Sequence, residues 1–426
     1  MRLVELNEVN FDLVSKYIDN GANLPFFSSL LSEHGYAETY NGVQDDYLEP
    51  WIQWPSFHLG LTPKDHGMFH LGDSPVDDPE QIFEMAEQYG HKVGVLSAMG
   101  ASNRLVSPAF FVPDPWSGAT PDESRFCTEL AKVLERSVNS NAQSKLLLKD
   151  LVWLSFQLFL ATNVKEKYEF VRECTNFFAN RTKKWKKAIL LDRILIFFFQ
   201  KLMTDRSATF GTLFLNGVAH IQHHHMLESS LFDGDADLYD EDPILSCYQC
   251  YDSMLDRLCT KYPEWVIATG LSQKPITNKV YFYRLDDHSR FLTSIGLINC
   301  DVQPLMSRDF WIHFKSELEA KAAIKTISRV KSADGQDVFG NFSIKANSLF
   351  VSLIFHDEIT EKSTFLLDRD VIDLFSMVSF VAIKNSGHAD RGYVFYSEKG
   401  KAKNTNRTSL IELRGILLEK LQFAVK

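Results

Sequence analysis

The fold is indicated most clearly by the stretch Gly211-Thr212-Leu213-Phe214-Leu215-Asn216-Gly217-Val218-Ala219-His220. Its first five residues form a short apolar run, which is typical of a buried strand. Asn216 and His220 follow at the carboxyl end of this strand, where open α/β sheets carry their ligands. A second polar segment, Ser386-Gly387-His388, precedes another strand-like run at residues 391–395. Together the two segments predict a functional site at one edge of a sheet.

Strand and helix patterns alternate around these segments. Short apolar runs at residues 3–6, 92–96 and 264–268 predict strands separated by helices, and this alternation favours parallel βαβ units. The expected fold class is therefore α/β, with a mainly parallel sheet flanked by helices. The expected boundaries are residues 1–120, 208–280 and 365–426 for the core, 121–207 for a helical cap and 281–364 for a mixed α/β insertion.

Composition limits the class of protein. The 426 residues include 45% hydrophobic and 13% aromatic side chains, which indicates a well-filled core rather than a disordered chain. A net charge of −10 provides no basic field for a phosphate backbone, so nucleic acid is not an expected partner. The six cysteines show no paired metal spacing, and a cytoplasmic location with reduced thiols is expected.

Two apolar stretches, at residues 146–161 and 189–203, are interrupted by charges. Both fall short of the roughly 18 apolar residues of a membrane span. Buried helices of the cap are one interpretation. A peripheral membrane contact through the cap is the alternative, because the basic run Arg181-Thr182-Lys183-Lys184-Trp185-Lys186-Lys187 lies between the two stretches.

The segment Leu59-Gly60-Leu61-Thr62-Pro63-Lys64-Asp65-His66-Gly67 resembles a motif of the alkaline phosphatase superfamily, in particular its phosphodiesterase and nucleotide-pyrophosphatase branch. The family pattern is Thr-Gly-x-x-Pro-x-x-His-Gly, and only Leu59 departs from it. Family members also carry a strand running into Asp-Gly, an Asp-x-x-x-His segment and a final Gly-x-His or Ser-x-His. Residues 6–8, 216–220 and 386–388 are similar to these. The resemblance covers the core and implies an alkaline-phosphatase-like fold.

Carried over position by position, the resemblance implies a depleted first metal site. The first aspartate ligand falls on Asn7, or on Glu8 if the register slips by one residue. The aspartate of the Asp-x-x-x-His segment falls on Asn216, whereas the histidines are retained as His220 and His388. An asparagine keeps the shape of an aspartate but lacks its negative charge.

The resemblance also implies that the nucleophile and the second metal site are missing. The nucleophile position falls on Pro50, or on Gln53 with a gap of three residues, and neither side chain can attack phosphorus. The Asp-His pair of the second metal falls on Gly270 and Leu271, which bind no cation. In the family, two cations offset the charge that develops on the phosphoryl group. A two-metal mechanism is therefore not expected here.

A metal-free polar pocket without a cofactor is the favoured interpretation. In this pocket Glu49, His220 and His388 are the expected catalytic residues, because a carboxylate beside an imidazole can act as a general acid or base. Arginine is expected to bind an anionic, phosphate-containing substrate, since a guanidinium matches the geometry of phosphate. The expected substrate-binding residues are Asn7, Glu8, Gln53, Asn216, His224, Arg284 and Arg308.

A single divalent metal such as zinc is the alternative interpretation. The expected ligands are then Asn216, His220 and His388. Further histidines crowd the loop His220-Ile221-Gln222-His223-His224-His225. If this loop starts a helix, His220 and His224 lie one turn apart and could supply two ligands.

Three functions are compatible with the sequence. The first is a transferase that moves a glycosyl or related group from a nucleotide- or phosphate-activated substrate to a glycan acceptor. The Trp51-Ile52-Gln53-Trp54 and Pro113-Asp114-Pro115-Trp116 arrangements are similar to those of proteins that accompany bacterial surface-polysaccharide genes. The second is a single-metal phosphoesterase or phosphodiesterase with water as the nucleophile. The third is a catalytically inactive binding protein that keeps an enzyme fold.

Overall fold

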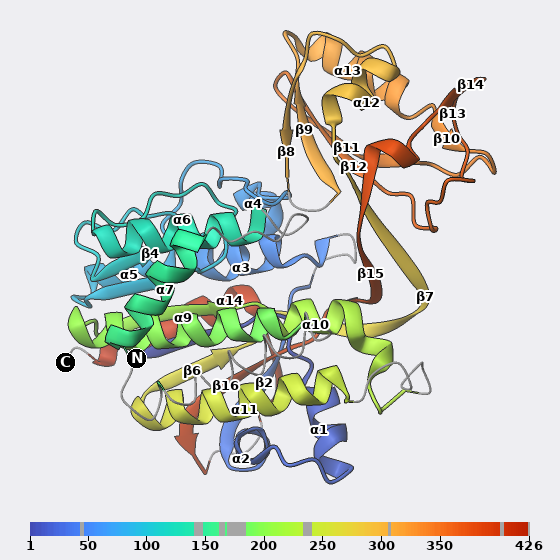
Figure 1. Cartoon of the computed structure of the whole chain (residues 1–426). Helices are drawn as coiled ribbons and strands as arrows, with labels where there is room; N and C mark the ends of the chain where they lie inside the picture. The colour runs from blue at the N-terminus through green and yellow to red at the C-terminus, as the bar shows by residue number, and fades with distance from the viewer. Residues whose placement is uncertain are drawn as a thin grey trace. The chain divides into compact units, whose positions relative to one another are not determined.

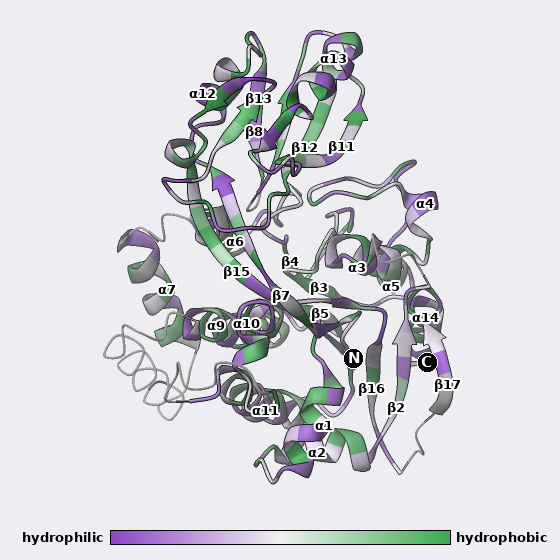
Figure 2. Ribbon diagram, turned by 90° about the vertical axis from the view of Figure 1, so that its right-hand side faces the viewer, coloured by the Kyte–Doolittle hydropathy of each residue, from purple (hydrophilic) through white to green (hydrophobic). Residues whose placement is uncertain are grey.

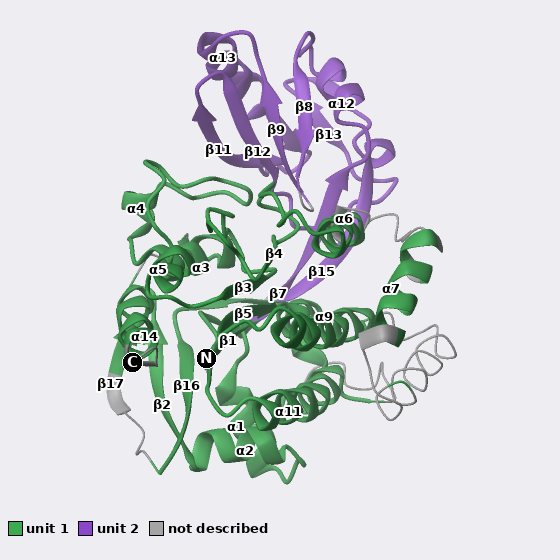
Figure 3. Ribbon diagram, turned by 90° about the vertical axis from the view of Figure 1, so that its left-hand side faces the viewer, with its two compact units in different colours: residues 1–137, 145–275, 386–426 green, residues 138–144, 276–385 purple. Residues whose placement is uncertain are grey.

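The computed structural model describes residues 1–42, 47–139, 148–161, 167, 185–232, 241–305, 308–400 and 404–424. The chain forms two compact units, which Figure 3 shows in different colours. The larger unit comprises residues 1–137, 145–275 and 386–426, and the smaller unit comprises residues 138–144 and 276–385. The domain boundaries expected from the sequence remain predictions.

A large sheet forms the centre of the larger unit (Figure 1). Its strands are β1 Arg2–Leu6, β2 His34–Tyr40, β3 Val93–Leu96, β4 Phe110–Val112, β5 Phe210–Leu215, β6 Trp265–Ala268, β16 Gly392–Lys399 and β17 Asn404–Ser409. Among the described residues the order is β17-β2-β16-β6-β1-β5-β3-β4. The run from β6 to β4 is parallel throughout, whereas β16 is antiparallel to both of its neighbours. The expected α/β fold with a mainly parallel sheet is confirmed.

Helices cover both faces of this sheet. They are α1 Phe11–Asp19, α2 Pro25–Ser32, α3 Pro50–Leu59, α4 Pro63–His66, α5 Ile82–Gln88, α6 Arg125–Asn139, α7 Leu148–Ala161, α9 Lys186–Asp205, α10 Gly217–His225, the 3-10 turn η2 Met226–Glu228, α11 Pro243–Lys261 and α14 Leu410–Ala424. Val4 and Leu6 of β1 belong to the apolar core shared with α9 and α11, whereas Leu3 belongs to the core shared with α3, α5 and α14. Figure 2 shows hydrophilic and hydrophobic residues together on α9 and α11, as expected of helices with one face on a sheet.

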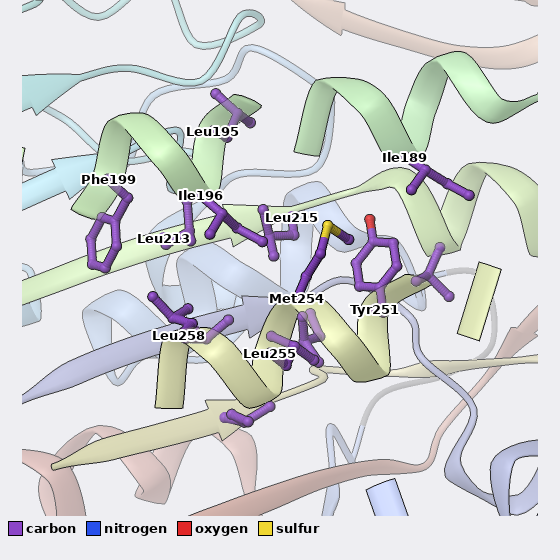
Figure 4. Close-up of a cluster of buried hydrophobic side chains, with 14 of the residues drawn as sticks. Ile189, Leu195, Ile196, Phe199, Leu213, Leu215, Tyr251, Met254, Leu255 and Leu258 are labelled. Atoms are coloured by element: carbon purple, nitrogen blue, oxygen red, sulfur yellow. The ribbon is translucent and has the colours of Figure 1, made fainter. Parts of the chain in front are cut away.

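The central strand β5 is buried along its whole length. Figure 4 shows Leu213 and Leu215 of β5 close to apolar side chains of α9 and α11. Burying a leucine side chain contributes roughly 1.5–3 kcal/mol, so these contacts fix the position of β5. The helix α9, which lies in the stretch expected to form a helical cap, packs directly on this part of the sheet.

The helix α7 presents apolar side chains to solvent. Val152, Phe156 and Phe159 are 61%, 58% and 61% exposed, at positions that share one helical face. None of the described helices is both long and apolar enough to cross a membrane. Peripheral membrane contact through the stretch expected as a cap remains a prediction.

The smaller unit mixes strands and helices around its own core. Its elements are β7 Ser272–Leu285, which begins in the larger unit, α12 His288–Ser294, β8 Asp301–Pro304, β9 Asp309–His313, α13 Glu317–Ile327, β10 Val330–Ser332, β11 Phe339–Lys345, β12 Ser348–Leu353, β13 Phe365–Leu367, β14 Asp370–Ile372, the 3-10 turn η4 Phe375–Met377 and β15 Val378–Ala389, which ends in the larger unit. The strands pair in the orders β11-β12-β9-β8, β10-β13-β14 and β15-β7. Apolar residues of α13 pack with β11 and β12 in this core.

Close packing at the start of β16 generates a prediction about stability. A Cβ atom on Gly392 would lie 2.2 Å from the carbonyl oxygen of Gly270 and 2.5 Å from Oγ1 of Thr39. We expect Gly392→Ala to lower the free energy of unfolding by about 1–3 kcal/mol, because backbone atoms have to move apart. Gly415 of α14 has no atom within 4 Å of its Cβ position, so Gly415→Ala should stabilise by about 0.5–1 kcal/mol. Urea unfolding measures both, and equal midpoints for the two variants would contradict the prediction.

Candidate metal centre

The carboxyl ends of β1, β5 and β6 bring polar residues together. β1 runs parallel to β5 on one side and to β6 on the other. The backbone N–H of Asn7 donates to the carbonyl oxygen of Leu215 at 3.0 Å, and that of Glu8 donates to Thr269 at 3.2 Å. The two residues that follow β1 are therefore held between the ends of the neighbouring strands, at the edge of the sheet where the sequence predicts a site.

One carboxylate and two imidazoles converge at this edge. Oε2 of Glu8 lies 3.0 Å from Nε2 of His223 and 3.3 Å from Nε2 of His388. The two imidazole Nε2 atoms lie 3.3 Å apart. Glu8 follows β1, His223 lies on α10 and His388 lies near the end of β15, so distant parts of the sequence supply the three groups. Among the described residues, these three form the group of metal-ligating side chains that could hold a cation.

The other nitrogen of each imidazole has its own partner. Nδ1 of His223 lies 3.4 Å from the hydroxyl oxygen of Ser386, and Nδ1 of His388 lies 3.5 Å from a carboxylate oxygen of Glu49. In metal sites, a partner on one ring nitrogen orients the imidazole and leaves the lone pair of the other nitrogen for the metal. Both rings are therefore arranged so that their Nε2 atoms face the same point as Glu8.

The donor set and its spacing fit a single divalent cation. Two imidazoles and one carboxylate form a ligand set that catalytic zinc sites use. Metal–ligand bonds of about 2.0–2.1 Å in a tetrahedral site place the ligand atoms about 3.3 Å from one another. The three distances among Glu8, His223 and His388 are 3.0, 3.3 and 3.3 Å. Three protein ligands leave a fourth position for water or substrate, as in catalytic rather than structural sites.

Glu8 carries the signs of a residue held for function. Its side chain is only 2% exposed, and its backbone φ of 60° lies in the left-handed region that non-glycine residues seldom adopt. The side-chain amide of Gln222 donates to the carbonyl oxygen of Glu8 at 2.6 Å, which holds this conformation. Burial disfavours the ionised carboxylate, but the facing imidazoles of His388 and His223 outweigh this effect and hold the pKa of Glu8 well below its usual value.

Asn7 and Asn216 are hydrogen-bonded to each other beside this cluster. Nδ2 of Asn7 donates to Oδ1 of Asn216 at 2.7 Å and to Oε1 of Glu8 at 2.9 Å. The indole N–H of Trp54 donates to Oδ1 of Asn7 at 2.8 Å. The two amides thus form a neutral hydrogen-bonded wall beside Glu8. Neither amide supplies the negative charge of an aspartate, and each amide oxygen already accepts a hydrogen bond.

The positions that the resemblance assigns to the Asp-His pair are filled by apolar packing. Leu271 is 1% exposed. Gly270 has a φ of 70°, and a Cβ atom there would lie 3.1 Å from the ring of Trp54.

The helix α10 divides its histidines between two faces. His220 and His224 form the predicted pair one turn apart, with ring centroids 4.8 Å apart, and His220 is exposed. His223 instead faces Glu8 and His388, so the cluster shares only His388 with the ligand set expected from the sequence. His223 was missed by the sequence reasoning. Its signal is its spacing of seven residues from Asn216, which places both on one face of the helix.

The remaining predicted site residues lie in different surroundings. Glu49 is the N-cap residue of α3, and its carboxylate lies 3.5 Å from Nδ1 of His388, whereas a catalytic role for either residue remains a prediction. Gln53 is 2% exposed, and its side-chain amide donates to the carbonyl oxygen of Tyr47 at 2.6 Å. Arg284 and Arg308 belong to the smaller unit, where the guanidinium of Arg308 lies over the ring of Phe282 at 4.4 Å. Substrate binding by the two arginines remains a prediction.

A buried aspartate fixes the start of α10. The carboxylate of Asp192 on α9 accepts hydrogen bonds from the backbone N–H of Gly217, at 2.7 Å, and from the hydroxyl of Tyr251. Burial raises the pKa of Asp192 to about 7, although these hydrogen bonds oppose the rise. Because Gly217 is the first residue of the helix that carries His223, Asp192 helps to set the position of that imidazole.

The two faces of α10 generate a prediction about metal binding. We expect His223→Ala to weaken binding of Zn²⁺ or Co²⁺ by more than about 100-fold. The reason is that removing a metal ligand lowers the affinity more than removing a residue that hydrogen-bonds to the ligand, which typically costs about 10–100-fold. His224→Ala is the matched control, since it removes a neighbouring imidazole from the same helix, and it should change the affinity by less than about threefold. Calorimetric titration of the purified variants measures both. Equal losses in the two variants would show that His223 is no ligand.

The buried Asp192 generates a prediction about pH. An acid whose pKa is raised on folding favours the folded state at low pH, and this contribution is lost as the pH rises through about 7. The free energy of unfolding of the wild type, relative to Asp192→Asn, should therefore fall between about pH 4 and pH 7 and then level off. Urea unfolding of both proteins across this range tests the prediction, and a difference that does not change with pH would contradict it.

Comparisons with known proteins concern the fold. No family model matches the chain, and no curated protein matches it. Solved structures similar to it include murine ectonucleotide pyrophosphatase/phosphodiesterase 5, at 11% identity and a TM-score of 0.44, covering 99% of this chain and 94% of that one. The human protein of the same name has 10% identity and a TM-score of 0.45, with the same coverage of the two chains. Phosphonoacetate hydrolase from Sinorhizobium meliloti 1021, in complex with phosphonoformate, has 12% identity and a TM-score of 0.41. The match covers 99% of this chain and 95% of that one.

With identities of 10–12% and TM-scores below 0.5, the comparisons assign no role to any residue of this chain. The function has to be inferred from the cluster of Glu8, His223 and His388 itself.

Proposed function

We propose that this chain is a metal-dependent phosphoesterase in which a single divalent cation is held by Glu8, His223 and His388 and water is the nucleophile. The observation that carries the proposal is the triangle of one carboxylate oxygen and two imidazole nitrogens, with sides of 3.0, 3.3 and 3.3 Å. A bound divalent cation supplies Lewis acidity toward a phosphoryl oxygen and favours the ionisation of water near neutral pH.

The choice of a phosphate ester rests on the motif at residues 59–67. In the structure this motif ends α3 at Gly60, whose φ is 65°, and forms the short helix α4. Nε2 of His66 lies 2.8 Å from the hydroxyl of Ser56 on α3. The motif thus fastens α3, and the opposite end of α3 carries Glu49 at the site. A motif that resembles those of phosphodiesterases is therefore connected, through one helix, to the proposed metal centre.

Glu49 marks the solvent side of the site. Its side chain is 32% exposed, compared with 2% for Glu8, 13% for His223 and 11% for His388. The partial positive charge of the helix N-terminus stabilises a carboxylate at this position. Substrate and water therefore reach the centre past Glu49. In this position Glu49 orients the imidazole of His388 and can accept a proton from the attacking water.

The triangle favours hydrolysis over glycosyl transfer by Glu49, His220 and His388. Glu49 and His388 do approach each other, but His220 points to a different face of α10 and pairs with His224. Glycosyl transfer and ligand binding without catalysis remain as outcomes of the experiment.

The proposed function predicts metal-dependent turnover. Protein stripped with a chelator and reloaded with Zn²⁺, Mn²⁺ or Mg²⁺ is assayed with bis(p-nitrophenyl) phosphate and p-nitrophenyl phosphate. We expect turnover only after reloading, and a loss of more than about 100-fold in kcat/KM for Glu8→Gln, because the carboxylate is then absent from the cation site. Gly415→Ala, whose added methyl group meets no neighbouring side chain, should stay within about threefold of the wild type.

Each other outcome has a meaning. Undiminished turnover in the presence of chelator would replace the metal centre with acid–base catalysis by Glu49 and His388. Absence of turnover in the metal-loaded protein on both substrates would contradict the phosphoesterase function and favour a binding protein. A nucleotide sugar that raises the melting temperature would then favour a transferase. An unchanged melting temperature would favour a protein that binds neither the nucleotide sugar nor the phosphate esters.

A further inference from the structure

Gln273 lies behind the cluster, and its orientation is forced by its neighbours. Its side chain is fully buried, and Nε2 donates both to Oε2 of Glu8 and to the carbonyl oxygen of Ala219, the latter at 3.0 Å. A carbonyl oxygen only accepts, so Nε2 rather than Oε1 has to face these two groups. The backbone of Gln273 is also held, because Nδ2 of Asn10 donates to its carbonyl oxygen at 2.6 Å.

The orientation of Gln273 decides the direction of the next hydrogen bond. Oε1 of Gln273 lies 2.5 Å from the hydroxyl oxygen of Ser386. Since Oε1 only accepts, the single hydroxyl proton of Ser386 has to point toward Gln273. Ser386 is 2% exposed, so no solvent competes for this proton. Its oxygen is then available only as an acceptor.

The direction of this chain of hydrogen bonds fixes the tautomer of His223. Nδ1 of His223 lies 3.4 Å from the oxygen of Ser386, which can only accept, so Nδ1 carries a proton. In neutral His223 the lone pair is therefore on Nε2, the atom that faces Glu8 and His388. The donors run in one direction, from His223 to Ser386, to Gln273 and to Glu8.

We infer that Gln273 and Ser386 are positioning residues that prepare the cluster for a divalent cation. Gln273 holds the carboxylate of Glu8 in place, and Ser386 selects the imidazole tautomer of His223 in which Nδ1 carries the proton and Nε2 can donate its lone pair to a cation. The inference rests on the proposed function only in requiring a metal at this site. It assigns the affinity for the cation to two residues that do not touch it. Partners of this kind set ligand orientation and basicity, and their loss typically costs 10–100-fold in metal affinity.

The positioning residues lie where the chain passes between its two compact units. The larger unit ends at residue 275 and resumes at residue 386, so Gln273 precedes one crossing and Ser386 follows the other directly. The strands that carry them, β7 and β15, pair with each other. The pairing of these two strands thus brings together residues 113 positions apart in the sequence, so that they share one hydrogen bond.

The test compares two buried serines, one beside the cluster and one in the smaller unit. Ser386→Ala removes the hydroxyl beside His223 and should weaken Co²⁺ binding by about 10–100-fold. Ser332→Ala is the matched control: Ser332 is also buried, and its hydroxyl accepts from the backbone N–H of Gln336 at 3.0 Å, outside the cluster. The control should lower stability while leaving Co²⁺ affinity within about threefold. Ser386→Thr keeps the hydroxyl and should restore the affinity of the wild type. The visible absorption of bound Co²⁺ and urea unfolding measure affinity and folding separately.

A second readout reports the tautomer directly. Two-bond ¹⁵N–¹H correlation spectra of the metal-free protein should show the proton of His223 on Nδ1 in the wild type, and a loss of this preference in Ser386→Ala. His223→Ala assigns the signal. A purely structural role of Ser386 would change stability without moving the tautomer.

The outcomes separate this inference from the proposed function. Cobalt binding by the wild type that Ser386→Ala leaves unchanged, or the absence of a proton from Nδ1 of wild-type His223, would overturn the inference and leave the metal centre in place. A folded wild type that binds no Co²⁺ would overturn both. Weakened binding in Ser386→Ala alone, without phosphoesterase turnover, would support the inference and overturn only the proposed reaction.

Discussion

The carboxylate of Glu8 is buried, and a buried negative charge destabilises a protein unless it is paired and hydrogen-bonded. Four neighbouring side chains provide this pairing and hydrogen bonding. Asn7 and Gln273 donate to its two oxygens, and the imidazoles of His223 and His388 face Oε2. Each partner comes from a different part of the fold. The carboxylate of Glu8 therefore connects four parts of the fold: the loop after β1, the helix α10 and the strands β7 and β15.

The same constraint bears on the number of metals. Two adjacent cations repel each other, so a two-metal centre needs several carboxylates, whereas one cation is neutralised by few. In the described cluster the charge comes from Glu8, while Asn7 and Asn216 contribute neutral amides that hydrogen-bond to each other. Trp54 occupies the space beside Gly270 where a further ligand would have to reach. The local chemistry is suited to one cation.

Support for the cluster extends one layer outward into the core. Asp192 accepts a hydrogen bond from the backbone N–H of Gly217, the first residue of α10. The hydrogen bond between His66 and Ser56 connects α4 to α3. Both α9 and α3 are packed against opposite faces of the sheet by apolar side chains. The side chains that we propose as ligands are thus supported by helices packed on the sheet, and metal coordination requires such support because it tolerates little displacement of the ligand atoms.

The sequence by itself predicted four strands of the parallel run, β1, β3, β5 and β6, but not β4, and it predicted a site at their carboxyl ends. β3, β5 and β6 are buried on both faces because helices cover both, and this leaves apolar runs that can be recognised without a structure, whereas β1 includes the buried, hydrogen-bonded Glu5. Polar residues at the ends of such strands, Asn7, Glu8 and Asn216, follow from the same pattern. Only the tertiary structure decided that His223, and not His220, faces Glu8. The phase of α10 depends on how the helix packs, and several histidines in a row offer no contrast from which to read it. Only the tertiary structure also placed Gln273 beside Ser386, since the direction of a hydrogen bond between distant residues depends on which atoms the fold brings face to face.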